Sequence, residues 1–93
     1  MQDTNNSPAN IPARVVLFTK NDCHLCVPAR ELVAAVCRDT GENWEEVNLD
    51  ELPEPTRSDL YAAHGEFLPV VEVDGVRRGF WRIEEFRLRK ALG

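Results

Sequence analysis

Short apolar runs, separated by polar turns, divide the chain into alternating strands and helices. Residues 14–19 are apolar and rich in β-branched side chains, which predicts a strand buried on both faces of a sheet. Apolar residues then recur at spacings of three and four, which predicts an amphipathic helix that ends at Thr40-Gly41. These apolar residues are Leu25, Ala29, Leu32, Val33 and Val36.

The rest of the chain predicts three more strands and two more helices. Pro53 and Pro55 introduce the first of these helices, and Asp74-Gly75 is typical of a two-residue hairpin turn. In chain order the elements are a strand at 44–49, a helix at 56–64 that ends at Gly65, strands at 68–73 and 76–80, and a helix at 82–92.

The resulting order is β-α-β-α-β-β-α, which indicates an α/β fold. A strand, a helix and a second parallel strand require a right-handed crossover, and the hairpin adds two antiparallel strands. We therefore expect a four-stranded mixed sheet with helices on both faces, the arrangement of a minimal thioredoxin fold. The polar residues 1–12, rich in Asn and Pro, are expected to form a mobile N-terminal tail, and residues 13–93 to form the domain.

Composition narrows the classes of function. The 93 residues suit one domain, and the net charge of −5 gives no overall attraction for nucleic acid. No apolar run reaches the ~20 residues that cross a bilayer, and no secretory signal is visible at the N-terminus. We therefore expect a cytoplasmic protein, where thiols stay reduced. Three cysteines do not suit a structural disulfide framework, so a Cys-x-x-Cys pair indicates redox or metal chemistry.

The segment Cys23-His24-Leu25-Cys26 lies where the first strand gives way to the first helix. Pro28 is tolerated only in the first turn of a helix, so Cys23 is expected at or just before the helix N-terminus. That end of a helix favours a thiolate, and Lys20 and a protonated His24 would add to the effect while Asp22 would oppose it. Cys23, the first and more exposed cysteine, is the predicted attacking thiol, and Cys26 is the predicted resolving thiol.

Two other interpretations of the cysteine pair stay open. Two cysteines three residues apart also occur by chance in buried helices. Zinc needs four ligands, for which His24, Cys37 and His64 are the further candidates, and no metal site is expected from this set. A c-type haem is excluded because Val27, not histidine, follows the second cysteine.

Cys37 can be placed by helix geometry. It follows Cys26 by eleven residues, so the two share a helix face but lie roughly 16 Å apart. Cys37 therefore cannot join the Cys23/Cys26 couple, and a small buried hydrophobic residue is favoured over a regulatory thiol.

The chain resembles the glutaredoxin-like proteins of the thioredoxin superfamily, and most of all the small bacterial group with a Cys-x-Leu-Cys centre. The resemblance spans residues 14–92 and is carried by residues 20–26, by Leu68-Pro69-Val70 and by Asp74-Gly75. It implies a thiol–disulfide oxidoreductase acting on protein or glutathione mixed disulfides. It also implies a cis Leu68–Pro69 bond that packs against the disulfide and presents the Leu68 backbone to a substrate. Lys20 matches a lysine that helps to hold a glutathione carboxylate.

The predicted substrate-contacting residues are therefore Lys20, His24, Leu68 and Pro69. The implied partners are a disulfide-bearing protein or a small thiol, with a monomeric enzyme and neither nucleic acid nor membrane. No bound cofactor is expected, and glutathione is a candidate co-substrate. Many glutaredoxins carry a Gly-Gly turn where this chain has Gly79-Phe80-Trp81-Arg82, so a flavoprotein reductase or a protein partner is an equally open electron donor.

Two other functions remain as alternatives: a non-enzymatic partner-binding module of the same fold, and metal or iron–sulfur carriage through Cys23. Charge is also divided along the chain, since six of the eleven basic residues lie in the C-terminal stretch and eight of the nine charged residues in 39–59 are acidic. Such runs form solvated faces or a partner-docking surface. Trp81 is either a packing residue or a neighbour of the cysteine pair, and His64 is expected to be a cation at a helix C-terminus.

Overall fold

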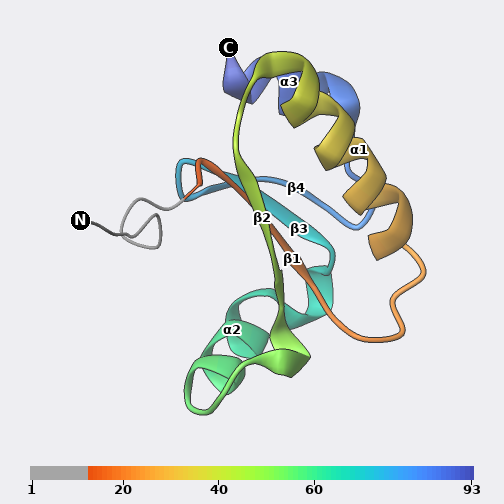
Figure 1. The fold of residues 1–93 in the computed structure, drawn as a ribbon. Coiled ribbons are helices and arrows are strands. Elements are labelled where there is room, and N and C mark those ends of the chain that lie inside the picture. The colour runs from red at the N-terminus through yellow and green to blue at the C-terminus, as the bar shows by residue number, and fades with distance from the viewer. Residues whose placement is uncertain (1–12) are drawn as a thin grey trace.

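The protein is described by a computed structural model that covers residues 13–93 (Figure 1). The tail expected over residues 1–12 lies outside the described residues. The elements run β1 (Val15–Thr19), α1 (Cys26–Thr40), β2 (Trp44–Asn48), α2 (Thr56–His64), β3 (Val70–Val73), β4 (Val76–Phe80) and α3 (Glu85–Leu92), with short 3-10 turns η2 (Leu49–Glu51) and η3 (Gly65–Phe67). The predicted β-α-β-α-β-β-α order is confirmed.

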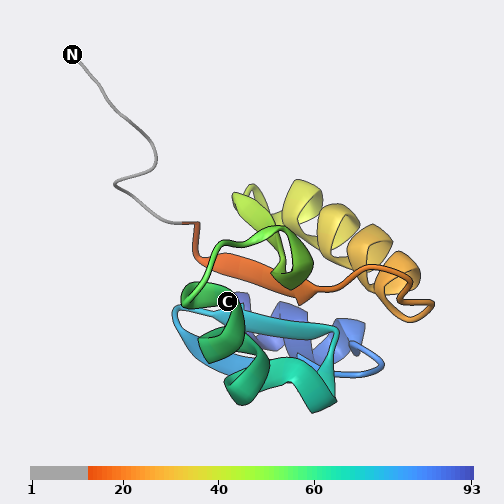
Figure 2. The ribbon, with the colours of Figure 1, turned by 90° about the horizontal axis from the view of Figure 1, so that it is seen from below.

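The sheet has the strand order β2-β1-β3-β4. β1 runs parallel to β2 and antiparallel to β3, and β3 and β4 form the hairpin. Helices α1 and α3 lie together on one face of the sheet and α2 lies on the other (Figures 1 and 2). The expected four-stranded mixed sheet with helices on both faces is therefore present.

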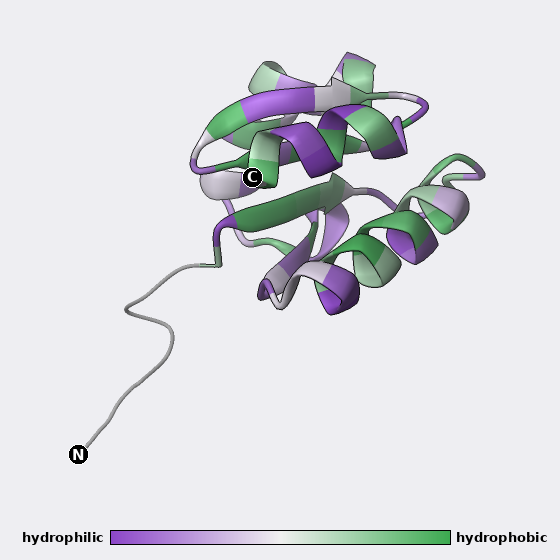
Figure 3. Cartoon of the chain, turned by 90° about the horizontal axis from the view of Figure 1, so that it is seen from above, coloured by the Kyte–Doolittle hydropathy of each residue, from purple (hydrophilic) through white to green (hydrophobic). Residues whose placement is uncertain are grey.

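Strand β1 separates two hydrophobic cores, because successive side chains of a strand point to opposite faces. Val15 and Leu17 pack in the core beneath α1 and α3, while Phe18 packs with Leu68 and Val70 on the α2 side. The strand that follows the grey N-terminal trace is accordingly mostly hydrophobic in Figure 3. The prediction of a strand buried on both faces is confirmed, and it places the end of β1 deep in the molecule.

Helix α1 and the hairpin end where the sequence predicts. Gly41 adopts a left-handed conformation with φ 74° and donates its N–H to the Cys37 carbonyl, which closes α1. Asp74 and Gly75 have φ values of 54° and 81°, as a two-residue type I′ turn requires. Cys37 is buried in the core beneath α1, and burial raises the pKa of its thiol. The expectation of a small buried residue is confirmed.

Two predicted boundaries shift by two residues or more. The third strand begins at Val70 rather than Leu68, because the intervening Pro69 lacks the N–H that a strand ladder needs. The last helix begins at Glu85 rather than Arg82, because Trp81 is left-handed with φ 59° and Glu84 is extended. Within residues 13–93 no helix combines the length and apolar character needed to cross a membrane.

His64 ends α2, as predicted, but the prediction that it is a cation there is wrong. Its ring is buried and stacks on Phe18 with centroids 4.5 Å apart. Burial, with a smaller contribution from Arg77, lowers the pKa of His64, so the imidazole is neutral at pH 7.

Candidate active site

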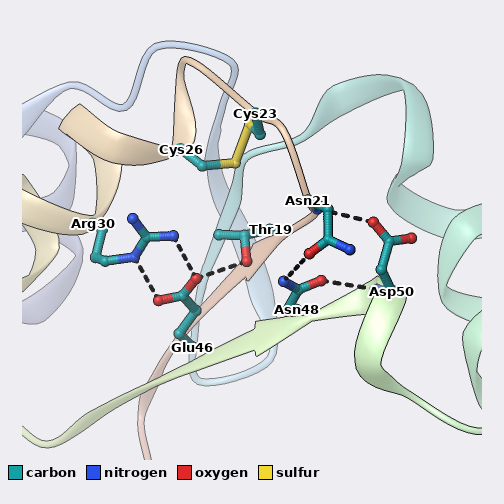
Figure 4. Close-up of a disulfide and its surroundings, with 8 residues drawn as sticks. All are labelled: Thr19, Asn21, Cys23, Cys26, Arg30, Glu46, Asn48 and Asp50. Carbon is teal, nitrogen blue, oxygen red and sulfur yellow. Dashed lines mark hydrogen bonds and ion pairs between the residues drawn. A yellow bond between two sulfur atoms is a disulfide. The ribbon is translucent and has the colours of Figure 1, made fainter.

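The two cysteines of the Cys-x-x-Cys segment are joined by a disulfide at the start of α1 (Figure 4). Their Cα atoms lie 5.3 Å apart. Cys26 is the first residue of the helix and is 1% exposed, whereas Cys23 precedes the helix and is half-buried. A molecule approaching from solvent therefore reaches the Cys23 sulfur and not the Cys26 sulfur.

The start of α1 leaves the positive end of the helix facing this disulfide. Leu25 occupies the N-cap position without a side-chain cap, and the first turn contains no acidic residue. Pro28 is the third residue of the helix, which confirms its expected place in the first turn. The Cys26 N–H donates to the Cys23 carbonyl at 3.2 Å, so the turn that carries the attacking position is tied to the helix. A sulfur anion at Cys23 would face the positive end of the helix dipole.

The loop between β1 and Cys23 is anchored to the end of the neighbouring parallel strand. The Asn21 N–H donates to Asp50, and the Asn48 side chain donates to the Asn21 side-chain oxygen, both at 2.9 Å. Tyr61 from α2 donates its hydroxyl to the same Asp50 carboxylate, and this bond is the main reason that the pKa of Asp50 is lowered. The loop is therefore held through Asn21 by Asn48 at the end of β2 and by Asp50 of η2 (Figure 4).

A second polar cluster lies on the α1 side of β1. Arg30, four residues after Cys26, donates to both carboxylate oxygens of Glu46 at 2.7 Å, and the buried Thr19 hydroxyl donates to Glu46 at 2.8 Å (Figure 4). The Arg30 hydrogen bonds are the main cause that lowers the pKa of Glu46. This cluster joins the first turns of α1 to the ends of β1 and to β2 through one carboxylate.

The bond between Leu68 and Pro69 is cis, as the resemblance implies. Both residues are buried. The Trp81 N–H donates to the carbonyls of Phe67 at 3.1 Å and Pro69 at 2.9 Å, and the Trp81 indole N–H donates to the Glu66 carbonyl at 3.0 Å. The end of β4 is thus fastened to the loop that enters β3.

Two surface depressions flank the Cys-x-x-Cys segment. The first brings the predicted residues Lys20 and His24 beside Cys23, and it is lined by Lys20, Asn21, Asp22, Cys23, His24, Val27, Pro28, Arg30 and Asn48. The second is lined by Leu25, Phe80, Trp81 and Arg82. Trp81 is therefore a neighbour of the Cys-x-x-Cys segment, although its ring also packs against Phe67 and Phe80, and the residue is 51% exposed.

Sequence reasoning missed the polar clusters and the apolar depression. A signal for the first cluster existed: Asn21 follows the carboxyl end of β1 and Asn48 is the last residue of β2, and such ends meet at one edge when the strands are parallel. The Arg30–Glu46 pair carried no such signal, because its residues are sixteen positions apart on different elements. Among residues 13–93 no group of three or more His, Cys, Asp or Glu side chains is arranged to hold a metal ion.

Comparison with known proteins agrees with this geometry. The family described as Glutaredoxin-like domain (DUF836) matches residues 14–93. Uncharacterized proteins of Mycobacterium bovis and Mycobacterium tuberculosis are each 32% identical over 76 residues, which covers 82% of this chain and 78% of the relative.

Solved structures share the fold. A structural genomics target protein from X. campestris superposes with a TM-score of 0.62 at 28% identity, covering 84% of this chain and 93% of that one. The glutaredoxin of Archaeoglobus fulgidus superposes with a TM-score of 0.61 at 19% identity, covering 86% of each chain. That second match shows the fold alone, but the match to the family spans nearly the whole described domain. The chain belongs to the glutaredoxin-like domain family.

Proposed function

We propose that the protein is a thiol–disulfide oxidoreductase in which Cys23 attacks the disulfide of a substrate and Cys26 resolves the intermediate. The observation that carries the proposal is the unequal exposure of two bonded cysteines at one helix N-terminus. The partly exposed Cys23 meets the substrate, and the buried Cys26 three residues away stays within bonding distance of it.

The reaction balances as a two-electron exchange. In the reduced protein the Cys23 thiolate attacks one sulfur of the substrate disulfide, and the other substrate sulfur leaves as a thiolate that takes a proton from water. Cys26 then loses its proton and attacks the Cys23 sulfur, which releases the second substrate thiol. The product is the Cys23–Cys26 disulfide seen in the structure. A thiol such as glutathione or a flavoprotein reductase must supply two electrons to reopen it.

The local charges support the first step. The uncapped start of α1 stabilises negative charge at Cys23, and Lys20 and His24 line the same depression. Asp22 also lies there and opposes them. Lys20 is suited to a carboxylate of glutathione or of a peptide terminus. In this proposal the backbone of Leu68, beside Pro69, pairs with the substrate main chain, and the protein acts as a cytosolic monomer.

Cysteine variants test the proposal directly. Cys23→Ser should abolish the catalysed reduction of a small disulfide such as hydroxyethyl disulfide, measured above the rate of glutathione or dithiothreitol alone, because the other free thiol of the described residues is buried. The matched control is Cys37→Ala, which removes the buried third cysteine and should keep the wild-type rate.

Other outcomes assign other functions. Wild-type turnover by Cys23→Ser would contradict the proposal. A protein without turnover, whose cysteines stay reduced in air, would indicate a non-enzymatic binding module. A coloured preparation made without oxygen, whose iron depends on Cys23, would indicate iron–sulfur carriage instead.

A further inference from the structure

Charge is divided between two parts of this molecule. Residues 76–93, which form β4, α3 and their connection, contain six of the eleven basic residues but only two of the sixteen acidic residues, Glu84 and Glu85. The chain as a whole carries −5, so its remainder is strongly acidic. A positive surface on an acidic protein gives a partner one preferred place and orientation of approach.

The positive surface lies on an open edge of the sheet. β4 is the last strand in the order β2-β1-β3-β4, and most of its side chains are exposed. Beside it is a groove lined by Arg77, Arg78, Gly79, Phe80, Arg82, Glu84 and Arg87. We call this groove the basic edge.

The basic residues of this edge differ in how they are engaged. Arg77 donates to the Ala63 carbonyl and to His64, and Arg87 pairs with Glu84 at 2.8 Å. Within residues 13–93, Arg78 and Arg82 have no acidic side chain within ion-pair distance, and both are exposed. These two guanidinium groups are available to an incoming carboxylate.

The basic edge is continuous with the redox site. Phe80 and Arg82 line both the basic edge and the apolar depression that Leu25 and Trp81 complete. Leu25 lies between the two cysteines in sequence. A substrate polypeptide whose cysteine reacts with Cys23 can therefore place the residues next to that cysteine against Leu25, Phe80 and Trp81. The residues that follow can then contact Arg82 and Arg78.

We propose that the basic edge docks an acidic segment of the disulfide-bearing substrate protein, with an apolar residue next to the reactive cysteine seated against Leu25, Phe80 and Trp81. This inference rests on the proposed function and names its substrate class. A short acidic segment fits because it meets only the positive region. A long nucleic acid would extend over the acidic remainder of the surface and be repelled.

The test uses three synthetic peptides that differ only in charge. Each carries one cysteine in a mixed disulfide with 2-nitro-5-thiobenzoate and one neighbouring leucine, followed by four glutamates, four glutamines or four lysines. The rate at which reduced protein releases the coloured thiol is measured in a single turnover. We expect the acidic peptide to react about tenfold faster than the neutral one at low ionic strength, and the ratio to approach one at about 1 M salt.

Charge reversal at the basic edge should reverse the preference. In Arg78→Glu/Arg82→Glu the lysine peptide should become the fastest of the three. Arg78→Glu alone should lower the acidic-to-neutral ratio several-fold. Its matched control, Arg38→Glu, makes the same change at an exposed arginine in the last turn of α1 and should keep the wild-type ratio.

The outcomes separate the two proposals. No reaction with any peptide would overturn the proposed function itself. Equal rates for the three peptides at low salt, or equal loss in Arg38→Glu, would overturn the docking surface alone. Self-association at low salt that Arg78→Glu/Arg82→Glu abolishes would also overturn the docking surface, because a second copy would then occupy the basic edge. Competition by a single-stranded oligonucleotide as strong as that by the acidic peptide would overturn it in the same way.

Discussion

At the scale of single residues, His64 is a buried titratable group held between opposite charges. Arg77 can only donate, so its 2.9 Å contact makes the His64 Nδ1 atom the acceptor. The proton of the neutral ring is then on Nε2, which faces the Glu72 carboxylate at 3.5 Å. Burial is the main cause that lowers the pKa of His64, Arg77 lowers it further, and Glu72 raises it.

Stability should therefore fall as the medium becomes mildly acidic. An unfolded histidine has a pKa of about 6.5, and His64 in the folded protein binds its proton only at lower pH. Below about pH 6.5, His64 binds a proton in the unfolded state but not in the folded state. The free energy of unfolding therefore decreases as the pH falls, by at most about 1.4 kcal/mol per pH unit. Urea unfolding of the oxidised protein between pH 7.5 and pH 5 measures this slope.

The second histidine supplies the control. The chain has two histidines, and His24 is exposed. His64→Gln should remove most of the slope and keep an acceptor for Arg77, whereas His24→Gln should leave the slope in place. A slope that survives in His64→Gln would contradict this account.

The environment of a side chain was predictable from the sequence only where its neighbours in space are also its neighbours in sequence. Cys23 and Cys26 are three positions apart beside a helix start, so their disulfide needs no distant element. The surroundings of His64 come from β1 and β4, through Phe18 and Arg77. The residues near position 64 in the sequence do not indicate these contacts, so the charge of His64 was predicted wrongly.

At the scale of secondary-structure elements, the start of α1 is the feature on which the chemistry depends. Its first turn has no acidic side chain, and Val27 is 51% exposed there. Val27→Glu should place a negative charge beside Cys23 and destabilise its thiolate. At a helix-end interaction of about 0.3–1 kcal/mol, alkylation of reduced Cys23 by iodoacetamide at pH 6 should slow roughly two- to fivefold.

A matched variant separates this local effect from a change in net charge. Val76, at the start of β4, is 49% exposed, so Val76→Glu makes the same substitution at similar exposure away from α1. It should leave the alkylation rate unchanged, and the slowing in Val27→Glu should weaken at high salt. Equal slowing in both variants would show that the helix end plays no special part.

Element boundaries were predictable where a residue stops an element by its own backbone. Gly41 and the Asp74-Gly75 turn ended elements as expected, because left-handed conformations suit these residue types. The start of α3 moved from Arg82 to Glu85 because Trp81 is held left-handed by hydrogen bonds to Phe67 and Pro69. That constraint comes from another part of the chain.

At the scale of the whole molecule, the topology followed from the order of elements and the handedness of the crossover. The site was only partly predictable, because it is assembled from separate segments: the Cys-x-x-Cys turn, the end of β2, the loop before β3 and the end of β4. Lys20 and His24 belong to the same short segment as Cys23 and line one depression with it, and their contact with substrate stays a prediction. Phe80 and Arg30 became visible only in the folded chain.

The measurement that tests the central claim most directly is capture of the covalent intermediate. In a Cys37→Ala background, reduced Cys26→Ser should accumulate a mixed disulfide between Cys23 and a substrate peptide, seen by intact mass after acid quenching, because the resolving thiol is absent. Reduced Cys23→Ser should form no mixed disulfide on the same timescale, because its remaining cysteine of the pair, Cys26, is only 1% exposed. An adduct that forms equally fast on Cys26 would contradict the assignment of Cys23 as the attacking thiol.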